Sequence, residues 1–149
     1  MRLKHITAGI IGALIIYVSL APALSETQGN ADVTFVRAIE TGKGVWTFHV
    51  TVAHPDTGWK DYANGWDVVL PDETVVKASA RDKFTRELFH PHEYEQPFTR
   101  SQSGLKLPTT VKTVRVRAHD IVDGFGGKEV VIDLTKSKGD HYKVERFSK

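Results

Sequence analysis

The sequence predicts an all-β fold, a seven-stranded antiparallel β-sandwich that follows an N-terminal signal peptide. Three observations carry this prediction: short segments in which hydrophobic and polar residues alternate, turn-forming residues between them, and a length of 149 residues that suits one domain. With 40% hydrophobic and 26% charged residues, the chain has the composition of a globular protein. The lack of cysteine excludes a disulfide scaffold, thiolate metal sites and a cysteine nucleophile.

Residues 1–25 have the three parts of a secretory signal peptide. Arg2 and Lys4 give a basic start, residues 6–20 carry no charge, and the small residues Ala23 and Ser25 follow. This pattern predicts export to the periplasm or secretion.

Two fates of the signal peptide are compatible with the sequence. Pro22 breaks a helix near the point where a peptidase needs extended chain, which favours cleavage after Ser25 or after Ala23. The alternative is an uncleaved anchor over residues 6–24, which is close to the roughly 20 residues that span a bilayer. The absence of cysteine after the apolar run excludes a lipid-anchored lipoprotein.

The charge balance argues against a nucleic-acid partner. The formal net charge of +2 includes Arg2 and Lys4, and without residues 1–25 the chain has 18 basic and 18 acidic residues. A net charge of zero removes the electrostatic support that nucleic-acid binding needs.

Seven strands are predicted in a sandwich domain over residues 32–134. Residues 45–53 alternate most clearly, with Trp46 and Phe48 on one face, and residues 113–119 and 128–134 alternate in the same way. A basic tail, loose or packed on an edge, is expected over residues 135–149. The predicted strands are 33–39, 45–53, 66–70, 74–89, 97–106, 113–119 and 128–134.

Residues 79–89 are ambiguous between helix and strand. The run 79–82 has the form of a capping box, and Phe84 and Leu88 lie four residues apart, which favours a short helix. Pro91 restricts the residue before it to an extended backbone conformation, which favours a long strand or an irregular crossing.

Part of this pattern resembles fibronectin type III and immunoglobulin-like domains. A Leu-x-Pro turn within residues 103–108 precedes an alternating Val-rich strand at 114–118, and Trp46 resembles the buried aromatic of the second strand. The resemblance implies a fibronectin type III-like order of strands over residues 32–134.

Five segments also resemble a family of small exported bacterial proteins that has no assigned activity. The resemblance implies export and a shared fold, and members often carry His where this chain has Asp123. The segments are Asp56–Trp59, Gly65–Val69, His90–Ser101, Arg117–Asp120 and Gly124–Lys128.

In that strand order, the connections 54–65, 90–96 and 120–127 fall at one end of the sandwich, where binding sites are commonly built. Four histidines are then gathered there, and His90-Pro91-His92 is an H-x-H pair whose rings point the same way in extended chain. The pattern predicts a site for divalent Zn or Cu. The predicted ligands are His90, His92 and His119, with His54 or Asp120 as a fourth. The plainer interpretation is that these histidines make loop hydrogen bonds.

The same end carries aromatic side chains that could bind a glycan or a protein. The aromatic residues Trp59, Tyr62, Trp66 and Phe125 could stack on sugar rings, with Asp61 and Asn64 nearby to fix hydroxyl groups. The candidate ligand-binding residues are Trp59, Tyr62, Phe125, Glu93 and Arg100. The alternative is that the Trp residues cover the core, since Trp is usually largely buried.

No nucleophile elbow, catalytic triad order or phosphate loop is present, and Glu95 is expected to pair with Arg100 rather than to act as an acid or base. We therefore expect an exported, monomeric, non-catalytic binding module. A membrane would be a partner only through an uncleaved signal.

Overall fold

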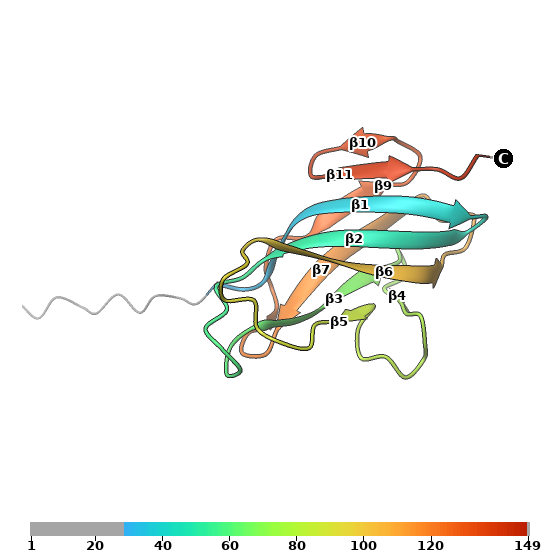
Figure 1. Cartoon of the computed structure of the whole chain (residues 1–149). Coiled ribbons are helices and arrows are strands. Elements are labelled where there is room, and N and C mark those ends of the chain that lie inside the picture. The colour runs from blue at the N-terminus through green and yellow to red at the C-terminus, as the bar shows by residue number, and fades with distance from the viewer. Residues whose placement is uncertain (1–28, 149) are drawn as a thin grey trace, which may run out of the picture.

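A computed structural model describes residues 29–148 as two β-sheets packed face to face (Figure 1). The predicted signal peptide, residues 1–25, lies outside the described residues. Within residues 29–148 no helix is long and apolar enough to cross a membrane. The two packed sheets agree with the sandwich architecture that the alternating segments predict.

The first sheet has five strands, and its neighbours run in the order β10-β11-β1-β2-β6. The pairs β1–β2, β2–β6 and β10–β11 are antiparallel, and β1–β11 is parallel. The strands are β1 (Asp32–Gly42), β2 (Val45–Ala53), β6 (Phe98–Lys106), β10 (Lys138–Gly139) and β11 (Tyr142–Glu145).

The second sheet is built on β3 and β7, which pair antiparallel from Ala63 with Asp120 to Val69 with Arg115. Two short strands, β4 and β5, pair with β3, and two others, β8 and β9, pair with β7. The strands are β3 (Ala63–Val69), β4 (Val75–Val76), β5 (Arg86–Glu87), β7 (Thr113–Asp120), β8 (Gly124–Phe125) and β9 (Val130–Asp133).

The core lies between the sheets and follows the predicted alternation. Along β2 and β7 every second residue is buried, because side chains alternate between the faces of a strand. Trp46 and Trp66 are both buried in this core. Its largest fully buried side chains include Phe48, Val50, Val52, Val68, Phe98, Leu105, Val116 and Ile132.

The predicted long strand 74–89 is wrong as a continuous element, and no helix forms there either. Only β4 and β5 are strands, and Ser79 and Asp82 close a turn in which Ser79 N–H donates to Asp82 Oδ2 at 2.9 Å. Thr85 then fastens the crossing to β3: its N–H donates to Asp67 Oδ1 at 3.0 Å, and its hydroxyl accepts from Val68 N–H at 2.8 Å. Hydrogen bonds of Thr85 with Val68 and the Asp67 side chain therefore take the place of the backbone hydrogen bonds that a continuous strand would make.

The sheet continues beyond the predicted domain boundary at residue 134. Within the segment expected to be a tail, β10 and β11 form a hairpin, and β11 pairs with β1 from Val36 with Tyr142 to Ile39 with Glu145. Tyr142 and Val144 are buried on the core side. With β8 and the division of 74–89, these strands raise the number in the described residues from the predicted seven to eleven.

Three connections meet at the end of the sandwich where β1 begins, on the left in Figure 1. They are residues 54–62 after β2, residues 88–97 before β6 and residues 121–123 after β7. Ile121 N–H donates to Tyr62 C=O at 3.2 Å, and His54 N–H donates to Gln96 Oε1 at 3.0 Å, so the three connections are tied together. We call this the loop end.

Candidate functional site

A buried histidine–carboxylate pair lies at the loop end. His54 follows β2 and continues the inward phase of Val50 and Val52, so its ring enters the core side of the sheet. Its Nδ1 lies 2.6 Å from Asp56 Oδ1, and neither side chain is exposed. With Nδ1 engaged by Asp56, Nε2 is the ring nitrogen left to bind another group.

Asp56 holds several backbone groups as well as the imidazole. It accepts from Ala63 N–H at 3.0 Å and from His92 N–H at 2.7 Å. Burial alone would raise the pKa of Asp56, but these hydrogen bonds and the one with His54 outweigh it and hold the pKa below its usual value. Asp56 is therefore a carboxylate that positions His54.

Two further carboxylates lie near His54, one in the same connection and one at the end of β7. Asp61 stands in a tight turn, in which its N–H donates to Gly58 C=O at 3.1 Å, and Asp120 ends β7. One potential ligand atom from each of His54, Asp61 and Asp120 lies within 4.8 Å of the other two. All three residues are buried. We call them the His/Asp cluster.

The cluster contains buried polar atoms that have no hydrogen-bond partner in residues 29–148. These atoms are Nε2 of His54 and both carboxylate oxygens of Asp61. Burial raises the pKa of Asp61, and the negative charges of Asp120, Asp123 and Asp56 add to this effect despite the opposing influence of His54. An unpaired buried carboxylate is costly, so an arrangement of this kind calls for a compensating positive charge.

The carboxylates around His54 also determine the pKa of its imidazole. Burial lowers the pKa of His54, but its hydrogen bond to Asp56 and the charges of Asp56, Asp120 and Asp61 outweigh this effect, and the pKa stands above its usual value. The pocket around Nε2 therefore favours positive charge.

The spacing of the cluster suits a small divalent cation. Zn²⁺ binds imidazole nitrogen and carboxylate oxygen at about 2.0–2.1 Å, so neighbouring ligand atoms in a tetrahedral site lie about 3.3 Å apart. His54 Nε2 and Asp61 Oδ1 are 3.6 Å apart. Two carboxylates and a neutral imidazole would also balance the charge of a divalent ion. The Nδ1 contact to Asp56 is the kind of outer hydrogen bond that orients metal-bound histidine.

The predicted H-x-H pair lies beside this cluster and does not join it. The rings of His90 and His92 are 4.5 Å apart, but His90 is exposed and its Nδ1 faces the Pro91 carbonyl. The His92 ring is buried and stacks on Phe98 at 3.8 Å. Burial, together with the charges of Arg100 and His90, lowers the pKa of His92.

His119 is turned away from the other predicted ligands. It has the outward phase of β7, where its Nδ1 lies 2.6 Å from Asn64 Oδ1 and its ring packs between Phe84 and Phe125. Of the five predicted ligands, the structure brings together His54 and Asp120. His119 is separated from them by the outward phase of β7, and His90 is exposed. The His92 ring stacks on Phe98, with its Nδ1 3.8 Å from Asp56 Oδ2, and does not join the cluster.

The residues predicted to bind a glycan or protein are in part already engaged. Arg100 pairs with Glu95 at 3.0 Å, as expected, and the Arg117 guanidinium covers Phe125 at 3.9 Å. Trp59 is 68% exposed and meets Tyr62 edge-on at 5.8 Å. Glu93 is exposed in the neighbouring connection.

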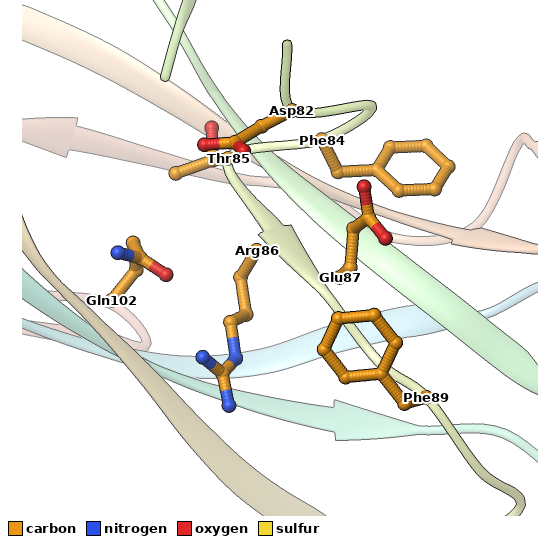
Figure 2. Close-up of a pocket in the computed structure, with 7 residues that line it drawn as sticks. All are labelled: Asp82, Phe84, Thr85, Arg86, Glu87, Phe89 and Gln102. Carbon is orange, nitrogen blue, oxygen red and sulfur yellow. The ribbon is translucent and has the colours of Figure 1, made fainter. Parts of the chain in front are cut away.

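A cavity of about 310 Å³ opens at the side of the sandwich near β5, away from the His/Asp cluster (Figure 2). Arg86 extends from β5 into it, and its Nε has no hydrogen-bond partner in the described part of the chain. The acidic residues of its lining already accept backbone N–H groups: Asp82 from Ser79 and Glu87 from Lys83. None of the residues of the His/Asp cluster lines this cavity.

Two residues of the site were not among the predicted ligands, namely Asp56 and Asp61. The spacing His54-Pro55-Asp56 could have indicated Asp56, because alternate residues of an extended chain lie on the same side. Asp61 had no comparable signal, since its position depends on the turn that joins Thr57 N–H to Asp61 C=O at 3.0 Å.

The fold and site together define a two-sheet β-sandwich with a buried histidine and two carboxylates at its loop end. The chain is similar to a protein named "Putative lipoprotein" from Halomicrobium mukohataei, with 38% identity over 105 residues. The match covers 70% of this chain and 47% of the relative, so the chain spans about half the length of the curated relative it matches. No family model and no solved structure matches the chain.

Proposed function

We propose that this protein is an exported binding module that holds one divalent metal ion in the His/Asp cluster. The single observation that carries the proposal is the set of buried, unpartnered atoms, His54 Nε2 and both oxygens of Asp61, turned toward Asp120. A divalent cation would satisfy these atoms at once and offset two buried carboxylates.

The residues have distinct roles in this proposal. His54, Asp61 and Asp120 are the ligands, and Asp56 positions the imidazole. Zn²⁺ fits a donor set of one nitrogen and carboxylate oxygens, and Cu²⁺ is the second candidate. Because His54 and Asp61 lie in the connection after β2 and Asp120 ends β7, the ion would act as a cross-link at the loop end.

Export is supported by the basic start, apolar run and small residues of positions 1–25 and by the name of the lipoprotein relative. The first, second and sixth strands share one sheet, and the third, seventh and ninth share the other. This grouping supports a fibronectin type III/immunoglobulin-like sandwich. We propose a cell-envelope location and a non-catalytic role.

Thermal unfolding of protein stripped with EDTA, before and after addition of Zn²⁺, tests the metal proposal. Zn²⁺ at about 100 times its Kd should add about 2.7 kcal/mol and raise the Tm by at least about 5 °C. His54→Gln and Asp61→Asn should abolish the rise. His49→Gln is the matched control, because His49 lies on β2 and faces Ser101 away from the cluster. An equal rise in all four proteins would refute the proposal.

A further inference from the structure

Exposed hydrophobic side chains gather at the loop end. Trp59 is 68% exposed, Tyr94 99%, Ile121 39% and Val122 58%. The other large exposed hydrophobic residues of the described chain are on β1, β9 and the C-terminal segment, together with Phe89, which begins the connection 88–97 but lines the cavity near β5. The loop end therefore carries an apolar patch that the fold leaves uncovered.

These side chains come from connections that touch one another. Trp59 contacts Tyr62, whose carbonyl accepts from Ile121 N–H at 3.2 Å. A Cβ placed on Gly58 would lie 3.6 Å from Glu93 Oε1, which brings the segment of Tyr94 beside the turn of Trp59. We call Trp59, Tyr62, Tyr94, Ile121 and Val122 the loop-end patch.

The chain enters the sandwich at this same end. Gly29 and Asn30 line a cavity together with His54, Pro55 and Gln96. The apolar run of the leader ends at Leu24, and the five steps from Leu24 to Gly29 reach about 18 Å at full extension. A leader retained in a membrane would therefore keep the start of the sandwich, and with it the loop end, within about 18 Å of the leader's apolar run.

We infer that the loop-end patch rests on the surface of a lipid bilayer. Trp and Tyr are the side chains that settle at the boundary between headgroups and acyl chains, and the aliphatic Ile121 and Val122 suit the layer beneath. Aliphatic side chains contribute little to a sugar-binding platform, so the composition favours lipid over glycan. This inference does not depend on the metal proposal.

The charges around the patch indicate which lipid. Within the three described connections of the loop end, Glu93, Glu95 and Asp123 are exposed, and Lys60 is the one Lys or Arg. Anionic headgroups would be repelled, so binding is to zwitterionic lipid and rests on apolar burial. It is consequently insensitive to salt, unlike attraction to an anionic surface.

The intrinsic fluorescence offers a direct readout. The chain has three Trp, and Trp46 and Trp66 are 2% and 0% exposed, so a change on adding vesicles reports on Trp59. The core residues all lie between Ala31 and Val144, so residues 26–149 contain the complete sandwich. This fragment lacks the apolar leader, which would itself bind lipid.

The experiment mixes the 26–149 protein, in EDTA, with phosphatidylcholine vesicles. We expect the Trp59 fluorescence to shift to the blue and to be quenched by brominated acyl chains. The protein should co-sediment with the vesicles, and 0.5 M salt should change the bound amount by less than about twofold. Trp59→Ala and Val122→Ser should each weaken co-sedimentation at least about fivefold. Phe89→Ala is the matched control, because Phe89 is 69% exposed and, although it begins the connection 88–97, it lines the cavity near β5 and is not part of the loop-end patch.

Three outcomes would overturn the inference. The first is no co-sedimentation of the unsubstituted protein with these vesicles. The second is an equal loss in Phe89→Ala and Trp59→Ala. The third is a dimer in sedimentation, or binding on a glycan array, that Trp59→Ala abolishes in the absence of vesicle binding. All three measurements are made in EDTA, so their results do not depend on whether the protein binds Zn²⁺.

Discussion

Nδ1 of His54 lies 2.6 Å from Oδ1 of Asp56, and both side chains are fully buried. This contact fixes the imidazole ring so that Nε2 points at Asp61 Oδ1, 3.6 Å away. A histidine held in this way is prepared to bind a cation before the cation arrives, because the cost of orienting the ring is already met by the fold.

Asp56→Asn should weaken Zn²⁺ binding by about 10- to 100-fold. The amide can still accept from a backbone N–H, but it loses the charge that favours His54 and part of its acceptor capacity. We also expect the metal-free protein to lose about 2 kcal/mol of unfolding free energy. Isothermal titration and urea unfolding measure the two effects.

The control for Asp56→Asn is Glu40→Gln. Glu40 is a buried carboxylate outside the cluster, where it accepts from Gly44 N–H at 3.0 Å and pairs with Arg146. Glu40→Gln should cost stability and leave the Zn²⁺ affinity unchanged. If both variants lose affinity equally, Asp56 has no specific positioning role.

Asp61→Asn separates binding from folding. In EDTA the variant should be as stable as the unsubstituted protein or more stable by about 1 kcal/mol, because a buried carboxylate without a hydrogen-bond partner is removed. In excess Zn²⁺ it should be the less stable of the two. Urea unfolding under both conditions gives the comparison, and a variant less stable in EDTA would argue that Asp61 is a structural residue only.

His90→Ala and His119→Gln should leave Zn²⁺ affinity within about twofold, even though the sequence pointed to both residues. His90 is exposed, and His119 faces Asn64 and Phe125 on the outer side of β7. Isothermal titration of the two variants is the measurement. A tenfold loss in either would place the ion among the surface histidines.

The alternation of the strands accounts for what the sequence could predict of the site. His54 continues the inward phase of Val50 and Val52, and Asp120 continues that of Val116 and Ala118. Both are therefore inside, and both were among the expected ligands. His119 has the opposite phase, so parity alone already separated it from them.

Other parts of the structure depend on contacts between distant segments and could not be predicted in this way. Asp61 enters the cluster only because the turn at residues 57–61 closes and because β3 pairs with β7, with Ala63 opposite Asp120. The crossing before β5 is held by the Thr85 side chain rather than by strand periodicity. β11 is four residues long and gains its place by parallel pairing with β1.

The stability of β11 gives a test of the fold beyond the predicted domain boundary. Val144→Ala should lower the unfolding free energy by about 1–2 kcal/mol, because Val144 is 4% exposed and loses two buried methyl groups. Val131→Ala should change it by less than about 0.5 kcal/mol, since Val131 is 63% exposed. Equal effects in urea unfolding would contradict the packing of β11 on the core.

His92 predicts a dependence of stability on pH. Burial lowers its pKa in the folded protein, so the unfolded chain binds a proton more readily. This contribution to stability is complete above the unfolded pKa of about 6.5 and is lost as the pH falls below that value through the lower folded pKa. His92→Phe keeps a ring to stack on Phe98 but cannot titrate.

In EDTA, lowering the pH from about 7.5 to about 5.5 should therefore cost the unsubstituted protein more Tm than it costs His92→Phe. The other histidines are present in both proteins, so the difference reports on His92 and on its charge interactions with His90 and Asp56. An identical loss in the two proteins would show that His92 keeps its ordinary pKa.

The most direct test of the central claim is the position of the ion in crystals grown with Zn²⁺. Anomalous diffraction at the zinc edge should show one main peak about 2.0–2.2 Å from His54 Nε2 and from oxygens of Asp61 and Asp120. A main peak on the H-x-H pair His90 and His92, or no peak at the His/Asp cluster, would contradict it.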